Sequence, residues 1–324
     1  MKAVVMNEFG GSDVLQFKEI PKPEPQPDEI LIKVIYTSVN YADIKNRTGN
    51  KAKANFPMIL GLDAAGVVEK VGASVESVKP GDRVICFPKG GAYAEYVLTS
   101  ELLTFKIPDE LDFKMAAACP TVGFLSYKLT YDLAQITPDD TVLVHSSAGG
   151  VGSTIIQMAK LLGAKRIIGT VSSLEKSSVP FELGADDVYT YTDFDEKIKE
   201  TTDGKGVDII FDSQAGEITE RSMKVLSHFG KLVHFGNSSG SIGNFNTKEV
   251  HASCRSVLGF SLGTTRKERP ETLEAVSQNV LELIVNGKLE IKVGTVFPLE
   301  KIAEAHDFIS SRKSTGKILI HVSD

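Results

Sequence analysis

The feature that most constrains the fold of this chain is a glycine-rich run at residues 147–152, which directly follows the apolar segment 141–144. A strand that enters such a turn and continues into an amphipathic helix directs the free N–H groups of that helix at the turn. Glycine is needed where the chain bends sharply, where the backbone approaches a pyrophosphate and where helix meets strand. Gly149 and Gly152 supply two of these positions, and Ser147 stands at the first. The run therefore predicts a dinucleotide-binding turn formed by Ser147, Ala148, Gly149, Gly150, Val151 and Gly152.

The segments around this turn alternate between strand-like and helix-like patterns. Apolar runs typical of strands occupy residues 141–145, 167–171, 187–189, 207–212 and 230–235. Helical patterns occupy residues 150–162, 174–183 and 217–226. Such alternation predicts a parallel sheet covered by helices on both faces, because parallel strands need crossover connections. We therefore expect an α/β fold with a doubly wound Rossmann sheet.

A different pattern flanks the alternating region on both sides. Short strands broken by proline and glycine are expected at residues 30–34, 64–71, 83–87 and 92–97. A longer helix at 270–286 and strands at 294–298 and 317–322 follow the alternating region. The two flanks are interpreted as one β-rich domain into which the α/β sheet is inserted. The predicted boundaries are 1–115 and 265–324 for the β-rich domain and 116–264 for the nucleotide-binding domain.

Composition excludes several classes of partner. The chain of 324 residues has a net charge of -6 and no run of Lys and Arg, so no nucleic-acid groove is expected. No apolar run approaches the roughly 20 residues that a bilayer span needs, and the N-terminus lacks the pattern of a signal peptide. These features predict a soluble protein of the cytoplasm. The three cysteines, Cys86, Cys119 and Cys254, are too widely separated for a disulfide framework or a metal knuckle.

The residues after the second strand of the alternating region bear on the choice of dinucleotide. Folds that select NAD place an acidic side chain there, where it bonds to the adenosine ribose. This chain has Val171 at that position, followed by Ser172, Ser173 and Lys176. Their hydroxyl and ammonium groups can donate hydrogen bonds to a 2′-phosphate, which a carboxylate would repel. We therefore predict NADPH as the cofactor; the alternative is that a serine only caps the next helix, beside Glu175.

The order of motifs along the whole chain is similar to that of one known family. Residues 39–49, 61–66, 120–123, 148–152 and 316–319 carry this resemblance. The chain resembles the zinc-independent, zeta-crystallin-like quinone oxidoreductase branch of the medium-chain dehydrogenase/reductase superfamily. The resemblance implies a GroES-like catalytic domain, an inserted Rossmann domain and NADPH in the cleft between them. It also implies a homodimer that forms near residues 257–263.

The same resemblance indicates that the chain uses no catalytic zinc. Zinc alcohol dehydrogenases carry Gly-His-Glu where this chain has Gly-Leu-Asp, and the central residue here, Leu62, cannot bind a metal. Their early cysteine ligand falls near Asn40 and Tyr41, a region without Cys or His. Tetrahedral zinc requires three or four converging ligands, which this sequence does not offer. We therefore expect no metal site.

Individual site residues also follow from the resemblance. It implies that the residues beside the nicotinamide are Asn40, Tyr41 and Asp43, which are predicted to be catalytic. Further cofactor contacts are implied for Tyr191, near the 2′-phosphate, and for Phe235, Gly236, Phe260 and Lys317. Tyr41 can donate a proton, or it can serve only as an aromatic wall while solvent supplies the proton. His145 and His234 are expected to be ordinary strand residues.

These features together predict an NADPH-dependent, zinc-free oxidoreductase that transfers hydride to a quinone or a similar activated carbonyl or alkene. Reduction of such acceptors leaves an enolate or phenolate, which needs only hydrogen-bond donors and a proton. Reduction of alkenals or enones is an open alternative. Enoyl-thioester reduction is less favoured, because Lys51 stands where the related reductases place a tyrosine acid. A protein that binds NADPH as a structural component or a sensor is a further alternative.

Overall fold

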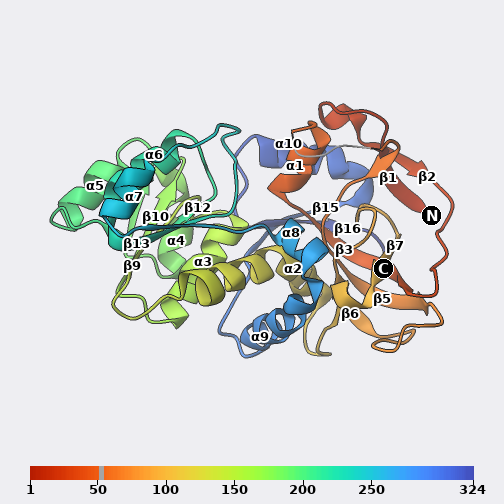
Figure 1. Ribbon diagram of the computed structural model, residues 1–324. Helices are drawn as coiled ribbons and strands as arrows, with labels where there is room; N and C mark the ends of the chain where they lie inside the picture. The colour runs from red at the N-terminus through yellow and green to blue at the C-terminus, as the bar shows by residue number, and fades with distance from the viewer. Residues whose placement is uncertain (51–54) are drawn as a thin grey trace. The chain divides into compact units, whose positions relative to one another are not determined.

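The chain folds around separate sets of strands, as Figure 1 shows for the computed structural model, which describes residues 1–50 and 55–324. One compact unit combines Met1–Phe124, Thr265–Gly287 and Ile291–Asp324, and a second combines Leu125–Thr264 and Lys288–Glu290. The first unit extends to Phe124, beyond the predicted limit at residue 115, because helix α2 (Phe113–Tyr127) runs through that point without a break.

The second unit is built on a six-stranded parallel sheet with the strand order β11-β10-β9-β12-β13-β14. Its strands are β9 (Thr141–Val144), β10 (Arg166–Val171), β11 (Asp187–Thr190), β12 (Val207–Asp212), β13 (Leu226–His234) and β14 (Ser256–Gly259). The order reverses between β9 and β12, which is the position where doubly wound sheets bind their ligands. This arrangement confirms the predicted Rossmann sheet.

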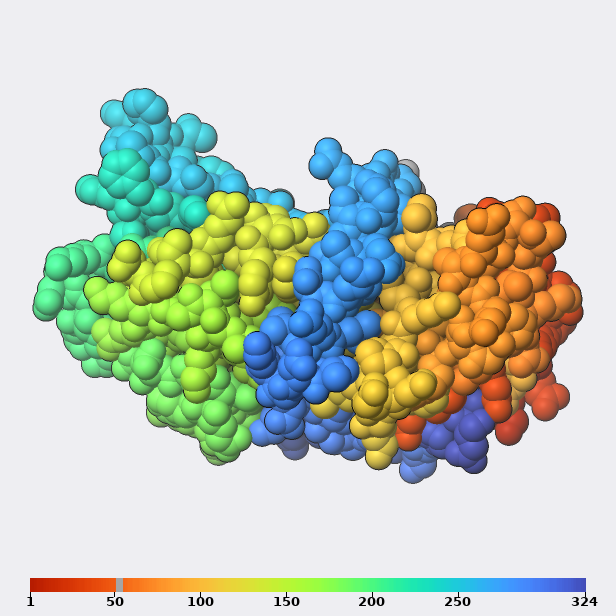
Figure 2. All heavy atoms as spheres, turned by 90° about the horizontal axis from the view of Figure 1, so that it is seen from below, coloured from red at the N-terminus to blue at the C-terminus, as the bar shows by residue number. Residues whose placement is uncertain are grey.

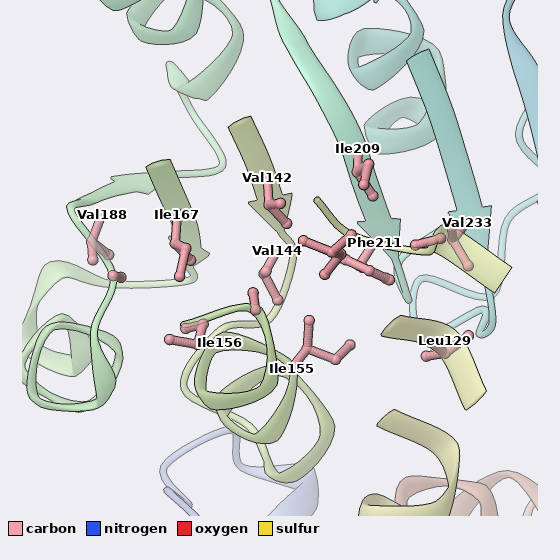
Figure 3. Packing of buried hydrophobic residues seen from close by; sticks show 14 of the residues in the cluster. Leu129, Val142, Val144, Ile155, Ile156, Ile167, Val188, Ile209, Phe211 and Val233 are labelled. Carbon is pink, nitrogen blue, oxygen red and sulfur yellow. The ribbon is translucent and has the colours of Figure 1, made fainter. Parts of the chain in front are cut away.

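Alternate residues of β9 face opposite sides of this sheet. Val142 and Val144 pack against helix α3 (Gly150–Leu161), as Figure 3 shows. Leu143 belongs to the cluster on the other face, together with residues of helix α5 (Phe194–Thr201). Both faces of β9 are therefore buried, which explains why its sequence is continuously apolar instead of alternating.

The other helices of the second unit are α4 (Ser178–Leu183), α6 (Glu217–Val225) and α7 (Thr247–Ala252), and α2 continues into a π-helix at Lys128–Ala134. The predicted helix at 174–183 is divided into a short 3-10 helix, η4 (Leu174–Lys176), and α4. Pro180 lacks the N–H that would bond the carbonyl of Lys176 in one continuous helix, and it is accommodated in the first turn of α4 instead.

The first unit is rich in β-structure and holds two sheets. The larger has the order β15-β16-β3-β5-β6-β8, with β7 also paired to β3, and the smaller has the order β2-β1-β4. The strands are β1 (Lys2–Met6), β2 (Gln16–Glu19), β3 (Glu29–Val39), β4 (Met58–Ile59), β5 (Ala64–Val71), β6 (Arg83–Cys86), β7 (Tyr96–Ser100), β8 (Thr104–Lys106), β15 (Val293–Pro298) and β16 (Lys317–His321). Ile318 of β16 lies opposite Val39 of β3, so the last strand of the chain runs beside the segment that precedes α1 (Tyr41–Arg47).

The remaining helices are α8 (Leu262–Glu268), α9 (Leu273–Val285) and α10 (Ile302–Ser310). Helix α9 contacts the short helix η2 (Glu101–Leu103), and Figure 2 shows the blue atoms of this late segment beside yellow-orange atoms of the early one. Residues from both ends of the chain therefore build the first unit together.

The predicted strand at 92–97 is confirmed only at its last two residues, because β7 begins at Tyr96 and continues to Ser100. Gly91 reverses the chain with a φ of +97°. The N–H groups of Ala92 and Tyr93 then donate to the carbonyl of Leu60, at 2.8 and 3.0 Å, instead of joining a strand ladder. A local pattern of apolar residues does not distinguish these two uses of the backbone N–H groups.

Candidate functional site

The chain forms a tight turn at the carboxyl end of β9. Gly149 is the N-cap of α3, and its N–H donates to the carbonyl of Ser146 at 2.9 Å. A Cβ at Gly152 would lie 2.3 Å from that same carbonyl oxygen, so only glycine permits this close approach. The first N–H groups of α3 have no partners within the helix and lie at the carboxyl edge of the sheet. The turn therefore has the close backbone approach and the free N–H groups on which the dinucleotide-binding prediction for residues 147–152 depends.

Ser147 links this turn to the neighbouring strand β10. Its hydroxyl and its N–H both donate to the carbonyl of Thr170, each at 2.9 Å, and the residue is fully buried. A Cβ at Gly169 would lie 2.7 Å from the Ser147 hydroxyl oxygen. Ser147 thus contributes to the turn through its position, and Gly169 is the residue of β10 that makes room for it.

The residues predicted to face a 2′-phosphate lie directly after β10. Ser172 is exposed, while Ser173 and Lys176 are half-buried. The Ser173 oxygen accepts a hydrogen bond from the N–H of Glu175 at 3.4 Å, so this serine caps η4 as the alternative interpretation expected. Its O–H still remains a donor. Capping and phosphate binding are therefore compatible at this position.

Tyr191 follows β11 and contacts the turn directly. Its hydroxyl accepts a hydrogen bond from the N–H of Ser146 at 2.7 Å, a contact that the sequence did not predict. Burial raises the pKa of this hydroxyl above its usual value. Tyr191 is therefore joined by a hydrogen bond to the residue that begins the glycine-rich turn.

The residues predicted to lie near the nicotinamide in this unit follow the next strands of the sheet. Phe235 comes after β13, and its N–H donates to the carbonyl of Asp212 at 3.0 Å. Phe260 comes after β14, and both rings pack against the buried cluster beside α3. A Cβ at Gly236 would lie 3.0 Å from the carbonyl oxygen of Ser213. These residues therefore share the carboxyl edge of the sheet with the glycine-rich turn.

The predicted catalytic residues of the first unit surround the start of α1. Asn40 and Asp43 form a capping box, in which the Asn40 N–H donates to the Asp43 carboxylate at 2.8 Å. Asp43 is fully buried, also accepts from the N–H of Gly61 at 3.3 Å, and its pKa is raised to about 6 by burial. Tyr41 is 44% exposed. Of these residues, Tyr41 has an accessible side chain, whereas Asp43 holds the backbone around it.

A buried carboxylate that the sequence analysis did not select organises this region. Asp63 is fully buried and accepts hydrogen bonds from the Ser38 hydroxyl and from the N–H of Thr121, the latter at 3.1 Å. The Asn40 side-chain nitrogen lies 3.4 Å from the same carboxylate. The sequence did contain a signal for this residue, because Asp63 directly precedes the apolar run Ala64-Ala65. An acid beside buried residues needs polar partners, since acids are rarely buried without them.

Two cations accompany this carboxylate. Lys317 is buried and donates to the side-chain oxygen of Asn40, and burial lowers its pKa despite nearby Asp63 and Asp43. Arg266 donates to the carbonyl of Leu62 at 3.0 Å, and burial lowers its pKa as well. Lys317, which was predicted to reach the cofactor, is therefore bound to Asn40 inside the first unit.

Comparison with known proteins decides the family. Residues 26–109 match the alcohol dehydrogenase GroES-like domain, and residues 150–278 match the zinc-binding dehydrogenase family. The quinone oxidoreductase of Homo sapiens is 35% identical over 326 residues, which cover 99% of this chain and 97% of that protein. This chain belongs to the quinone oxidoreductase branch of the medium-chain dehydrogenase/reductase superfamily.

Bacterial members of the branch match the chain equally well. Quinone oxidoreductase 1 of Escherichia coli is 34% identical, and the match covers 98% of each chain. The solved structure of Escherichia coli quinone oxidoreductase complexed with NADPH has a TM-score of 0.93 and 32% identity, and covers 99% of this chain and 100% of that one. These matches confirm the resemblance and the pairing of a GroES-like domain with a Rossmann domain, and they place the chain among the oxidoreductases.

The described part of this chain contains neither a group of side chains that could hold a metal ion nor a helix that could span a membrane. Within residues 1–50 and 55–324, no group of three His, Cys, Asp or Glu side chains could hold a metal ion. Lys51, which bears on enoyl-thioester reduction, lies outside the described residues. No helix in the described part of the chain combines the length and the hydropathy needed to cross a membrane.

His145 connects β9 to the turn, and its ring links the neighbouring strand β10 to helix α6. One ring nitrogen lies 2.8 Å from the Thr170 hydroxyl and the other lies 2.8 Å from the Ser222 hydroxyl. The residue is fully buried, and burial lowers its pKa to about 4. His145 is therefore a framework residue of the Rossmann unit, although it lies just after β9 and not within the strand as expected.

We expect the stability of this unit to fall in acid because of His145. Between pH 6.5 and pH 4 the unfolded chain binds a proton at this histidine that the folded protein does not bind. The free energy of unfolding should therefore fall as the pH is lowered through that window. Thermal melting at pH 7.5 and pH 5 should show a smaller drop for His145→Gln than for the wild type. Equal drops would contradict the assignment.

Proposed function

We propose that this protein is an NADPH-dependent, zinc-free reductase that transfers hydride to a quinone or a similar activated carbonyl or alkene. The observation that carries the proposal is the turn at the end of β9, where Gly152 packs against the Ser146 carbonyl and the first N–H groups of α3 are free to bind a pyrophosphate. The full-length relatives named quinone oxidoreductase, one of them solved with NADPH, support the same cofactor and acceptor.

The residues of the Rossmann unit would hold the pyrophosphate and the 2′-phosphate, the two charged groups of the cofactor. NADPH, when bound, supplies the hydride. The free N–H groups at the start of α3 would hold its pyrophosphate. Ser172, Ser173 and Lys176 would donate hydrogen bonds to its 2′-phosphate, since no carboxylate stands at the end of β10 to repel it. The protein therefore contributes mainly binding and orientation.

The first unit would supply the groups that meet the acceptor. Tyr41 is the exposed residue of the predicted catalytic set, and its hydroxyl could donate a proton to the oxygen of the reduced acceptor. The Lys317 ammonium donates a hydrogen bond to the side-chain oxygen of Asn40. The position of the Asn40 side chain is therefore set before any substrate binds. This arrangement suits an acceptor that needs a hydrogen-bond donor and a proton.

The side chains of the first unit do not suit a catalytic zinc. Leu62 stands where the zinc enzymes of the resembled superfamily place histidine, and it offers no ligand atom. The Asp63 carboxylate is already used by protein donors. Burial raises the pKa values of the Cys86 and Cys119 thiols, which disfavours the thiolate form that binds metals.

NADPH oxidation against a panel of quinones, alkenals and enoyl thioesters tests this proposal. We expect the highest kcat/KM with a quinone or an enone, unchanged after dialysis against a chelator. Loss of activity on chelation would contradict the zinc-free assignment. Tight NADPH binding without turnover on any acceptor would favour the structural or sensor alternative.

We expect Tyr41→Phe to lower kcat by less than about tenfold, because solvent can replace a single proton donor at an exposed position. The substitution keeps the aromatic surface and removes only the hydroxyl. Steady-state kinetics with saturating NADPH would measure the effect. A larger loss would show that Tyr41 is an essential general acid.

Assembly and location complete the proposal. Strand β14 is the last strand at one edge of the Rossmann sheet, and we propose that a homodimer forms through this edge. An exposed strand edge presents unpaired N–H and carbonyl groups to a second copy. All three cysteines are free, which is consistent with the proposed location in the cytoplasm.

A further inference from the structure

Ser146 has an unusual backbone conformation just before the glycine-rich turn. Its φ is +55°, a left-handed value that a residue other than glycine rarely adopts without support. Its carbonyl accepts the N–H of Gly149 and is the surface against which Gly152 packs. A change in the conformation of Ser146 would therefore change the shape of the turn itself.

Tyr191 holds Ser146 from the side of β11. Its hydroxyl oxygen accepts the Ser146 N–H at 2.7 Å and lies 3.2 Å from the Ser146 hydroxyl oxygen. The first contact uses the tyrosine as an acceptor, and the second can use its proton. In the second contact either hydroxyl can be the donor, and the Thr170 side chain also bonds the Tyr191 hydroxyl, so this hydroxyl connects the turn to β10 as well.

Gln214 holds Ser146 from the side of β12. Its side-chain nitrogen donates to the Ser146 hydroxyl oxygen, and the hydroxyl of Ser213 lies 3.3 Å from the same oxygen. The backbone N–H of Gln214 is bound in turn by the buried Asp212 carboxylate at 2.7 Å. The segments that follow β9, β11 and β12 thus meet at Ser146.

We infer that Tyr191 and Gln214 are positioning residues, which hold Ser146 in its left-handed conformation and thereby preserve the pyrophosphate-binding shape of the turn. This inference rests on the proposed dinucleotide function. It gives Tyr191 a role common to NADPH and NADH, in place of the 2′-phosphate contact implied by the family resemblance. A residue that binds the 2′-phosphate would discriminate between the two cofactors, whereas a residue that shapes the turn would not.

The two roles are separated by measuring the affinities of Tyr191→Phe for NADPH, NADH and ADP-ribose. Removal of the hydroxyl leaves the part-buried N–H of Ser146 without its acceptor, and we expect all three ligands to bind roughly tenfold more weakly. The ratio of the NADPH and NADH dissociation constants should stay within about twofold of the wild-type ratio. Ligand fluorescence titrations give the first two constants and displacement gives the third.

Two control variants sharpen the comparison. Tyr189→Phe makes the same substitution on β11, but Tyr189 packs with the cluster on the other side of the sheet, so no affinity should change. Lys176→Met should weaken NADPH binding and leave NADH and ADP-ribose unchanged. Gln214→Leu provides a second test of the inference and should weaken all three ligands, as Tyr191→Phe does.

Weaker binding of NADPH alone by Tyr191→Phe would overturn the inference, because that result assigns the hydroxyl to the 2′-phosphate. Unchanged affinities in both Tyr191→Phe and Gln214→Leu would also overturn it. If Tyr191→Phe does not fold, the Gln214→Leu result decides the question alone. A wild-type protein that binds none of the ligands would instead contradict the proposed function.

Discussion

Replacing Gly152 with alanine should lower the affinity for NADPH on the order of 100-fold, because the added carbon has no space. A Cβ at this position would lie 2.3 Å from the Ser146 carbonyl oxygen and 2.9 Å from the Ser147 Cα, both of which are backbone atoms. Neither can rotate away as a side chain would. Helix α3 must therefore move back from the turn, and its N–H groups move with it.

The same substitution should destabilise the protein by about 1–3 kcal/mol, the usual effect of overpacking a buried site. Gly149→Ala is a matched control for stability. Gly149 has an extended backbone, and a Cβ there would meet a single atom, the Ser146 carbonyl oxygen, at 3.3 Å. We expect its melting temperature to stay close to that of the wild type. Wild-type NADPH affinity in Gly152→Ala would show that the close approach is not required.

Asp63→Asn should have the largest effect on stability, a loss of about 3–5 kcal/mol in the free energy of unfolding. The substitution removes the negative charge near buried Lys317 and places an NH2 group among the donors of Ser38, Asn40 and Thr121. Whichever way the new amide is turned, at least one buried donor loses its acceptor. Urea denaturation measures this loss.

Asp109→Asn is the matched control, since that aspartate is almost completely exposed. Its effect should stay within about 0.5 kcal/mol. The double variant Asp63→Asn with Lys317→Met should lose less stability than the sum of the single variants, because no buried ammonium is left without a nearby anion. Additive losses would mean that Asp63 and Lys317 do not stabilise each other.

Much of the fold could be predicted because its signals are local. The run 141–144 is apolar without alternation, which indicates a strand buried on both faces, and Gly149 with Gly152 marks the turn after it. The choice of NADPH depended on the last position of β10, where Val171 stands in place of an acidic residue, and on the donors Ser172, Ser173 and Lys176 that follow it. Periodicity, glycine positions and residue charge are all properties of a few neighbouring residues.

The candidate site was less predictable where residues distant in the sequence meet. Tyr191 and Gln214 are 45 and 68 positions from Ser146, and no pattern in the sequence links them to it. Lys317 and Asn40 are 277 positions apart and meet because β16 pairs with β3. Only the register of the strands brings these side chains within hydrogen-bonding distance.

The sequence by itself determined the glycine-rich turn, the Rossmann sheet around it and the family of the chain, because each depends on local backbone preferences and on motif order. The tertiary structure alone decided that the segments after β11 and β12 hold Ser146 and that Asp63, Lys317 and Asn40 form one buried cluster. A hydrogen bond requires its donor and acceptor to lie about 3 Å apart, and for residues far apart in the chain only the packed fold determines that distance.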